Sequence, residues 1–257
     1  MSSLEISVPP ALPVSPSRPH NWYFLGSAVI ALFAYAAFNL GHLAVMTMAM
    51  AWNGNPAMTE AQIEKLVSQG GIFAAGTIAA CLFVLAVLWA AIWIARQRFA
   101  NYLALRWPSR AELVRGLAIT LAFLLASDLL SLLAGQETPA SVIESYRSAR
   151  DAGLVWLLLI AFCVAAPITE EFVVRGLLYR GWSHSFLGPL GAIVLSSALW
   201  ALIHHQYSWY YVGQVFLVGL IFGHLRYRSG STWVPVVAHG LFNLAVTAQT
   251  AVILAYF

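Results

Sequence analysis

The sequence predicts an all-α integral membrane protein, built as a bundle of about seven transmembrane helices. Of its 257 residues, 61% are hydrophobic and only 9% are charged, whereas an average soluble domain is roughly 25% charged. The hydrophobic residues form long continuous runs, which are typical of helical spans and not of the short alternating segments of a β-barrel. The composition therefore excludes a soluble globular enzyme and a disordered chain.

The charge and the cysteines agree with a membrane setting. The net charge is +3, but an excess of arginine in a membrane protein usually reports cytoplasmic loops. We therefore expect a lipid bilayer around the chain and no nucleic acid as a partner. Cys81 and Cys163 each lie inside an apolar run, so they are interpreted as small hydrophobic residues without a disulfide.

The chain divides into a tail and one membrane domain. Residues 1–21 are rich in proline and serine and lack the apolar core of a signal peptide, which predicts a disordered N-terminal tail. The single membrane domain follows over residues 22–257. A bilayer core requires about 20 apolar residues per helix, and the expected spans are Trp22–Met50, Gly71–Ala95, Ala111–Ala134, Leu154–Arg180, Leu187–His205, Trp209–Leu225 and Trp233–Phe257.

Individual spans carry further signals. The first is long enough to be tilted or interrupted at Asn39–Gly41. The fourth contains Pro167, which predicts a kink because proline lacks the N–H that a helix interior needs. The sixth is the shortest and contains Gly219 and Gly223, a small-xxx-small pattern that predicts close helix packing.

Arginine is concentrated in alternate loops, and this predicts the orientation. The loops after spans two, four and six carry Arg96, Arg98, Arg106, Arg110, Arg180, Arg226 and Arg228. Because basic residues accumulate in cytoplasmic loops, we expect a cytoplasmic N-terminus and an external C-terminus. The arginine-rich, lysine-poor composition indicates a bacterial source, so the expected location is the inner (cell) membrane.

Three charged residues interrupt span four. An ionised group near a helix centre costs roughly 2.5–3.5 kcal/mol, so Glu170, Glu171 and Arg175 must face the protein interior or a wet cavity. Glu171 and Arg175 are four residues apart, share a helix face and can form an ion pair. Glu170 points about 100° away and has no local partner. It is therefore the carboxylate expected to be free for chemistry, for example as a general base.

Spans five and seven each carry a histidine with a partner one turn away. Trp200 and His204 end span five, and His239 and Asn243 lie in span seven. Glu170 and His204 are each about 24 Å from the turn that joins spans four and five, at a rise of about 1.5 Å per residue. In an antiparallel hairpin they would lie at similar depth. The sequence therefore predicts a site of these side chains between spans four, five and seven.

Each feature also has a purely structural explanation. An isolated Glu171–Arg175 pair could be only an ion pair, and His204 could end its helix at the membrane interface. His239 and Asn243 could supply interhelical hydrogen bonds, worth roughly 0.6 kcal/mol each. Their joint occurrence on three spans is harder to explain by packing and favours a functional site.

In order and spacing, these residues resemble the three motifs of the CPBP family, the CAAX proteases and bacteriocin-processing enzymes also called the Abi family. The similarity covers roughly residues 154–244, and the motifs read Glu170-Glu171-x-x-x-Arg175, Trp200-x-x-x-His204 and His239-x-x-x-Asn243. Trp200 stands where the family usually has phenylalanine. We expect it to keep the aromatic packing role and to stay outside the chemistry.

The resemblance implies an intramembrane endopeptidase that acts on a peptide or protein substrate at the membrane. By matching positions, Glu170 and His204 would activate the attacking water, and His239 and Asn243 would complete the site. Glu171, Arg175 and Trp200 would support it. A divalent metal such as zinc could be held by Glu170, His204 and His239 with one open position, and a metal-free mechanism fits the same residues equally well.

Two other functional classes also fit. A non-catalytic role, as a bacteriocin-immunity protein or a membrane scaffold, is known in the resembling family. A transporter also uses charged residues inside the membrane, although the chain shows no obvious inverted repeat. Replacing Glu170 by glutamine separates these classes, because a scaffold tolerates the change and a protease does not.

Overall fold

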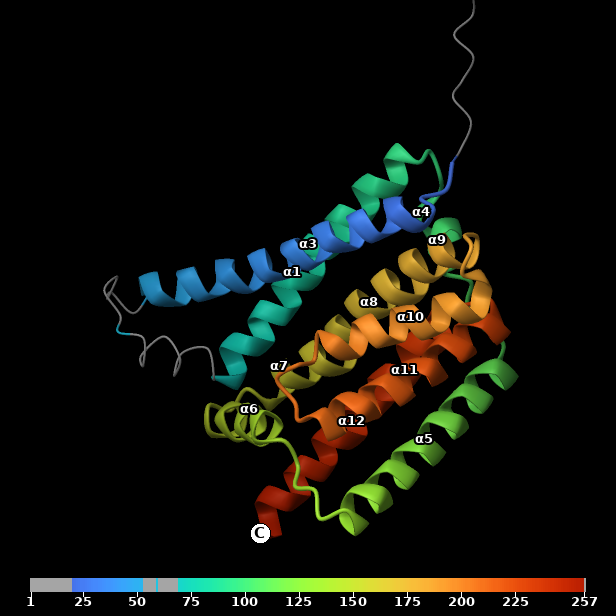
Figure 1. The fold of residues 1–257 in the computed structure, drawn as a ribbon. Helices are drawn as coiled ribbons and strands as arrows, with labels where there is room; N and C mark the ends of the chain where they lie inside the picture. Colours follow the sequence, from blue (N-terminus) through green and yellow to red (C-terminus); the bar gives the residue numbers. More distant parts are fainter. Residues whose placement is uncertain (1–19, 53–58, 60–68, 257) are drawn as a thin grey trace, which may run out of the picture.

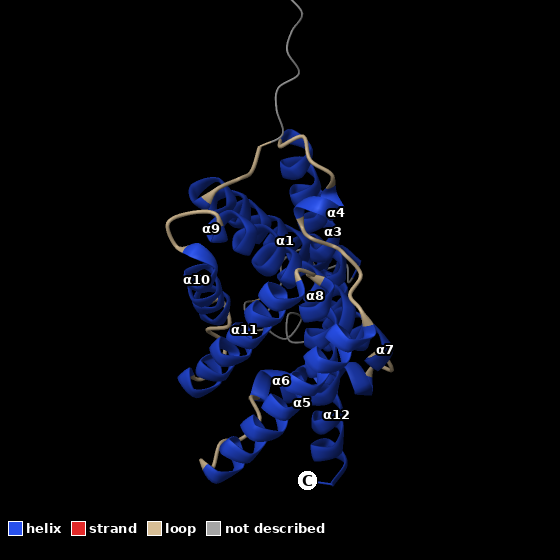
Figure 2. Ribbon diagram, turned by 90° about the vertical axis from the view of Figure 1, so that its right-hand side faces the viewer, coloured by secondary structure: helices blue, strands red, loops and turns tan. Residues whose placement is uncertain are grey.

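The computed structural model describes residues 20–52, 59 and 69–256. Within these ranges the chain forms helices joined by loops and contains no strand (Figure 2). The all-α prediction is therefore confirmed for the described part of the chain. The disordered tail predicted for residues 1–21 falls almost wholly outside the described residues.

The long helices follow the predicted spans closely. They are α1 (Phe24–Trp52), α3 (Gly70–Ile94), α5 (Arg110–Leu133), α10 (Gly188–Leu202), α11 (Trp209–Ser229) and α12 (Trp233–Tyr256). The fourth span is a continuous series of α7 (Val155–Ile160), the π-helix η1 (Ala161–Ala165), α8 (Ala166–Glu171), the π-helix η2 (Phe172–Leu178) and α9 (Tyr179–Ser183). Two short helices were not expected from the sequence, namely α4 (Phe99–Tyr102) and α6 (Ala140–Asp151).

Five helical segments of the described chain are long and apolar enough to cross a membrane. They are Phe24–Trp52, Gly70–Ile94, Arg110–Leu133, Val155–Ser183 and Trp233–Tyr256. These segments fit a multi-pass integral membrane protein. The expected count of seven spans is supported only in part, because α10 has 15 residues and reaches about 22 Å, short of a hydrocarbon core of about 30 Å. The remaining predicted span, α11, is not among the five.

Local sequence explains where two of these helices start and stop. Ser109 begins α5 with a capping box, in which its hydroxyl accepts from the Glu112 N–H and the Glu112 carboxylate accepts from the Ser109 N–H. At the C-terminal end of α11, Gly230 adopts a φ of 63° and ends the helix. Glycine suits this left-handed position because it has no Cβ.

The fourth span lies in the middle of the bundle (Figure 1). Its η1 and α8 segments pack against both α3 and α12, and its η2 segment packs against α1 and α10. On the outside, α1 pairs with α3, α10 with α11, and α5 with α12. The first motif is therefore surrounded by protein, as its charged side chains require.

The glycines of α11 allow it to approach α10 closely. A Cβ at Gly223 would lie 2.7 Å from the Ile193 side chain, and one at Gly219 would lie 3.1 Å from the Trp200 ring. Both separations are tighter than normal van der Waals contact. The packing role predicted for this small-residue pattern is therefore confirmed.

The arginine-rich loops meet at one end of the bundle, the end that carries α4 and α9 in Figure 1. Arg180, in the last helix (α9) of the fourth span, donates to the carbonyl of Tyr102 at 3.1 Å. Arg106, in the loop after α4, donates to the carbonyl of Ser229, the last residue of α11. Three loops that were expected on the same side of the membrane thus contact one another.

Candidate active site

Pro167 interrupts the helical hydrogen bonds just before the first motif. The N–H of Ala166 donates five residues back, to the carbonyl of Ala161, in the π-helical pattern. The next residue is Pro167, which has no N–H to continue this pattern to Phe162. The side chain of Asn243 donates to the Phe162 carbonyl instead, at 2.7 Å. Asn243 therefore completes the backbone hydrogen bonds of the interrupted span.

The ion pair expected between Glu171 and Arg175 is present and fully buried. Arg175 Nη1 lies 3.0 Å from Glu171 Oε1, and the two side chains are 1% and 0% exposed. Arg175 also donates through Nη2 to the carbonyl of Gly219 at 2.9 Å. Both charges are thus neutralised within the protein, which buried ions require.

His239 binds the same carboxylate oxygen, a contact that the sequence did not predict. Its Nδ1 lies 3.0 Å from Glu171 Oε1. Because a carboxylate oxygen only accepts, Nδ1 must carry a proton. The ring also stacks on Phe222, with centroids 5.3 Å apart. Glu171 therefore orients His239 and leaves its Nε2 available, so this glutamate does more than pair with Arg175.

Glu170 is only half-buried and makes a different contact. Its Oε2 accepts a hydrogen bond from the indole Nε1–H of Trp200 at 2.6 Å. Its Oε1 accepts no hydrogen bond from the described residues, so it is available to a water or a substrate. The structure thereby corrects the expectation that Trp200 only packs, because the indole N–H is in direct contact with the carboxylate.

His204 lies just beyond the last residue of α10. Its Nδ1 donates to the carbonyl of Trp200 at 2.8 Å, so Nε2 is again left available. Its ring meets the edge of the Trp200 ring, with centroids 5.2 Å apart. Within the described residues, no hydrogen bond joins Glu170 to His204 or to His239.

The depth of Glu170 in the hairpin of spans four and five differs from the expected depth. It contacts Trp200, one turn before His204, whereas equal depth of Glu170 and His204 was expected. The expectation assumed an α-helical rise throughout, but η2 follows Glu171 directly. Hydrogen bonds from residue i to i+5 wind the chain more widely, so this segment advances less per residue and shifts the register.

Tyr207 is a further neighbour of the site, and the sequence did not assign it a role there. Its ring stacks on His204 with centroids 6.0 Å apart. Burial raises the pKa of Tyr207, and the negative charge of Glu170 raises it further. The phenol therefore keeps its proton near this carboxylate. Only its position, three residues after His204, could have drawn attention to it.

The indole of Trp200 is the point where the predicted residues meet. The Arg175 guanidinium lies over the ring, 4.7 Å from its centroid, and the ring of His239 lies 5.5 Å away. Together with the contacts to Glu170 and His204, this gathers charged and imidazole groups from α8, η2, α12 and the loop after α10 in one place. Asn243 is committed to the Phe162 carbonyl and does not contact the indole.

The predicted metal set does not form a cluster. Among the residues that the structure describes, no three His, Cys, Asp or Glu side chains are grouped so that they could hold a metal ion. Glu170, His204 and His239 surround the indole instead of one common point. A zinc site at Glu170, His204 and His239 therefore stays a prediction, and the present arrangement of these three side chains does not fit it.

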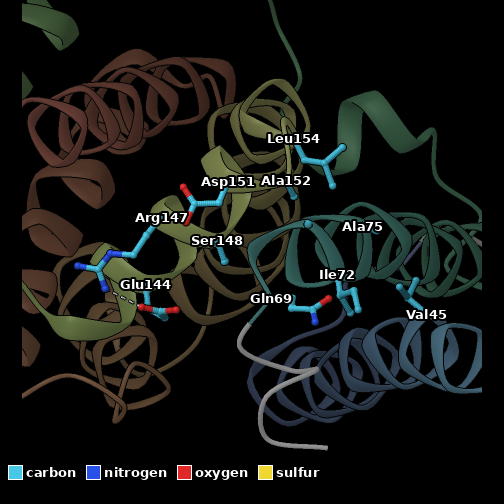
Figure 3. Close-up of a pocket in the computed structure, with 11 residues that line it drawn as sticks. Val45, Gln69, Ile72, Ala75, Glu144, Arg147, Ser148, Asp151, Ala152 and Leu154 are labelled. Atoms are coloured by element: carbon cyan, nitrogen blue, oxygen red, sulfur yellow. Dashed lines mark hydrogen bonds and ion pairs between the residues drawn. The ribbon is translucent and has the colours of Figure 1, made fainter. Parts of the chain in front are cut away.

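A cavity of about 630 Å³ lies in another part of the molecule (Figure 3). It opens between α1, α3 and α6, and the ion pair of Glu144 and Arg147 lines part of it. None of the predicted site residues is among its lining residues. The candidate active site and this cavity are therefore separate features.

Comparison with known proteins agrees with the motif reading. Residues 152–245 match the family model described as type II CAAX prenyl endopeptidase Rce1-like. UPF0177 protein YbdI of Lactococcus lactis subsp. lactis (strain IL1403) is 34% identical over 94 residues, which cover 35% of this chain and 48% of that protein. An uncharacterized 24.3 kDa protein of Escherichia coli is 34% identical over 88 residues, which cover 33% of this chain and 40% of that protein.

The match is therefore partial on both sides, and the chain spans less than half the length of each of these relatives. No solved structure matches the chain significantly. The matched segment nevertheless contains the Glu-Glu, the Trp-His and the His-Asn motifs in full. The resemblance to the CPBP family is confirmed over residues 152–245, the Rce1-like segment of this chain.

Proposed function

We propose that the protein is an intramembrane endopeptidase that hydrolyses a peptide bond within or beside the bilayer, with water activated by Glu170 and His204. The observation that carries the proposal is the set of contacts around Trp200. Its indole N–H binds Glu170 at 2.6 Å, and the two histidine rings lie 5.2 and 5.5 Å from the indole. The match to the Rce1-like model, which describes a family of endopeptidases, also supports hydrolysis of a peptide bond.

In the proposed reaction, a water binds at the unoccupied Oε1 of Glu170 and gives up a proton to this carboxylate. His204 assists through Nε2, because its Nδ1 is already committed to the Trp200 carbonyl. The water oxygen bonds to the peptide carbonyl carbon, the C–N bond then breaks, and the proton passes to the leaving nitrogen. The products are a carboxylic acid, which ionises on release, and an amine, and each transfer needs hydrogen-bond reach or one bridging water.

The developing oxyanion requires a donor, and His239 is the best placed candidate. With both ring nitrogens protonated, Nδ1–H binds Glu171 at 3.0 Å and Nε2–H is free to donate. Asn243 was expected to share this role. Its amide donates to Phe162, so it would first have to leave that carbonyl. We therefore assign the oxyanion role to His239 and a supporting role to Asn243.

The setting proposed for this reaction is a bacterial inner membrane, with the N-terminus and the arginine-rich end of the bundle in the cytoplasm. The contacts among the arginine-rich loops support a common side for them. The two relatives named above are also bacterial proteins. The partners are the lipid bilayer and a peptide or protein substrate.

The test uses the purified protein in liposomes. Three probes are compared, namely a farnesylated peptide ending in a CAAX sequence, the same peptide without the farnesyl group, and a mixture of membrane-inserted peptides. Mass spectrometry identifies any shortened product, and Glu170→Gln is the control. Cleavage of any probe by the wild-type protein only is expected. Cleavage that persists in Glu170→Gln contradicts the role given to Glu170. No cleavage of any probe contradicts the proposal and favours a scaffold or a transporter.

A further inference from the structure

We propose that Trp200 is a positioning residue, whose indole N–H holds the Glu170 carboxylate in the orientation that activates water. This inference rests on the proposed function and deepens it. The position usually carries phenylalanine in the resembling family, and a phenyl ring has no donor to offer. The hydrogen bond is therefore a feature of this chain that the family motif does not supply.

The geometry of the contact supports a strong hydrogen bond. The Trp200 Nε1 to Glu170 Oε2 distance is 2.6 Å, and Trp200 is only 4% exposed. A hydrogen bond to an ionised carboxylate is shorter and stronger than a neutral one. Because one oxygen is occupied by the indole, the other is the oxygen left to receive water. The bond thus selects one orientation of the Glu170 carboxylate.

Trp200 also fixes the second member of the proposed pair. Its backbone carbonyl accepts from His204 Nδ1 at 2.8 Å, which sets the tautomer and directs Nε2 away from the helix. One residue therefore orients Glu170 through its side chain and His204 through its main chain. A phenylalanine at this position would keep the second contact and lose the first.

The indole is itself held tightly, as a positioning residue must be. The Arg175 guanidinium lies 4.7 Å from its ring centroid, and the Phe222 ring lies 6.2 Å away on the side of α11. The backbone of Gly219 is so close that a Cβ there would lie 3.1 Å from the ring. With these neighbours the ring cannot swing, so the direction of its N–H is fixed before substrate binds.

The kinetic test removes the donor and keeps the ring. Trp200→Phe removes the N–H, and β-(3-benzothienyl)alanine at position 200 keeps the bicyclic shape with sulfur in place of N–H. For both we expect kcat to fall about 10- to 100-fold, with KM near the wild-type value. The benzothienyl variant should also melt near the wild-type temperature, whereas Trp200→Phe should melt lower because its smaller ring leaves a cavity. Trp93→Phe is the matched control, because Trp93 is 68% exposed and far from the motifs in sequence. Its kcat should stay at the wild-type value.

If Trp200→Phe misfolds, the benzothienyl variant alone tests whether the indole N–H contributes to kcat. A kcat within about twofold of wild type for that variant, or one above it, overturns the proposal. A higher kcat would mean that the hydrogen bond restrains Glu170 instead of positioning it.

A spectroscopic test is independent of cleavage. The indole N–H resonance of Trp200 is identified in ¹⁵N-labelled protein by its loss in Trp200→Phe, and its shift is then compared in Glu170→Gln and in the control Glu144→Gln. We expect a clear shift in the first only. An unmoved resonance in a protein that cleaves peptides overturns the Trp200 assignment alone. Absence of any cleavage by the wild-type protein, with a moved resonance, overturns the proposed function and leaves only the hydrogen bond.

Discussion

Replacing Glu171 by glutamine should destabilise the protein strongly, although the two side chains have nearly the same shape and differ only in the carboxylate and the uncharged amide. Glu171 Oε1 accepts from Arg175 at 3.0 Å and from His239 at 3.0 Å. The side chain is 0% exposed and Arg175 is 1% exposed, so water cannot replace the lost charge. The variant strands a guanidinium in the interior of the bundle.

The size of this destabilisation depends on the contacts that Arg175 keeps in the variant. Breaking one side of a buried ion pair typically costs about 3–5 kcal/mol. Arg175 retains the Gly219 carbonyl at 2.9 Å and the faces of Trp200 and Phe222, and a desolvated cation–π contact is worth about 2 kcal/mol. We therefore expect the lower end, about 3 kcal/mol. At about 2–4 °C per kcal/mol for a chain of this size, the melting temperature falls by about 6–12 °C.

The assay is thermal unfolding in detergent, with Glu144→Gln as the matched control. Glu144 pairs with Arg147 at 2.9 Å, but the two side chains are 50% and 46% exposed. An exposed pair is worth at most about 1 kcal/mol, so this variant should melt close to wild type. A double variant, Glu171→Leu with Arg175→Met, should recover stability because no charge is stranded. If Glu171→Gln melts no lower than Glu144→Gln, loss of the Glu171 charge does not destabilise the fold and the prediction is wrong.

Three further predictions concern packing, hydrogen bonding and topology. Gly240→Ala should lower stability by about 1–3 kcal/mol, because the new Cβ would lie 2.5 Å from the Cys163 carbonyl oxygen; unchanged melting would contradict the close packing of α12. Asn243→Ala should cost about 1–3 kcal/mol by leaving the Phe162 carbonyl without its donor, and chemical denaturation would measure it; a neutral effect would mean that water replaces the amide. A cysteine at Arg228 should react with a membrane-impermeant maleimide only in opened cells, and labelling of intact cells would reverse the orientation.

Much of the fold could be predicted from local sequence alone. The apolar runs located the long helices because a membrane span needs only length and hydrophobicity. The Glu171–Arg175 pair could be predicted because both residues lie on one helix, four positions apart. The close approach of α11 to α10 followed from the spacing of Gly219 and Gly223 for the same reason.

The contacts between helices were harder to predict, because they depend on register. The π-helix after Glu171 moved Glu170 level with Trp200, and an i to i+5 pattern leaves no clear signal in the sequence. The direction of His239 toward Glu171 depended on the packing of α12 against α8, which no local pattern gives. The resemblance gave Asn243 a role in the site, and its bond to the Phe162 carbonyl could not be predicted because the hydrogen-bond gap at Pro167 became visible only with the π-helix before it.

The expected count of seven spans is supported only in part, since five helical segments of the described chain are long and apolar enough to cross a membrane. Trp209–Leu225 contains many aromatic residues, which belong to interfaces as readily as to the bilayer core. Gly188–Leu202 ends before His204 because the chain turns there. Both helices are present where the sequence placed them, and their crossing of the bilayer stays a prediction.

The central claim is that Glu170 activates the attacking water, and the most direct measurement is the cleavage rate of Glu170→Gln in liposomes. With any peptide that the wild-type protein cleaves, kcat should fall by about 10²- to 10⁴-fold, the contribution of a general base, while the melting temperature stays at or above the wild-type value. Glu144→Gln, assayed in parallel, should cleave at the wild-type rate. If Glu170→Gln cleaves as fast as Glu144→Gln, the carboxylate beside Trp200 is not the base, and the account is contradicted.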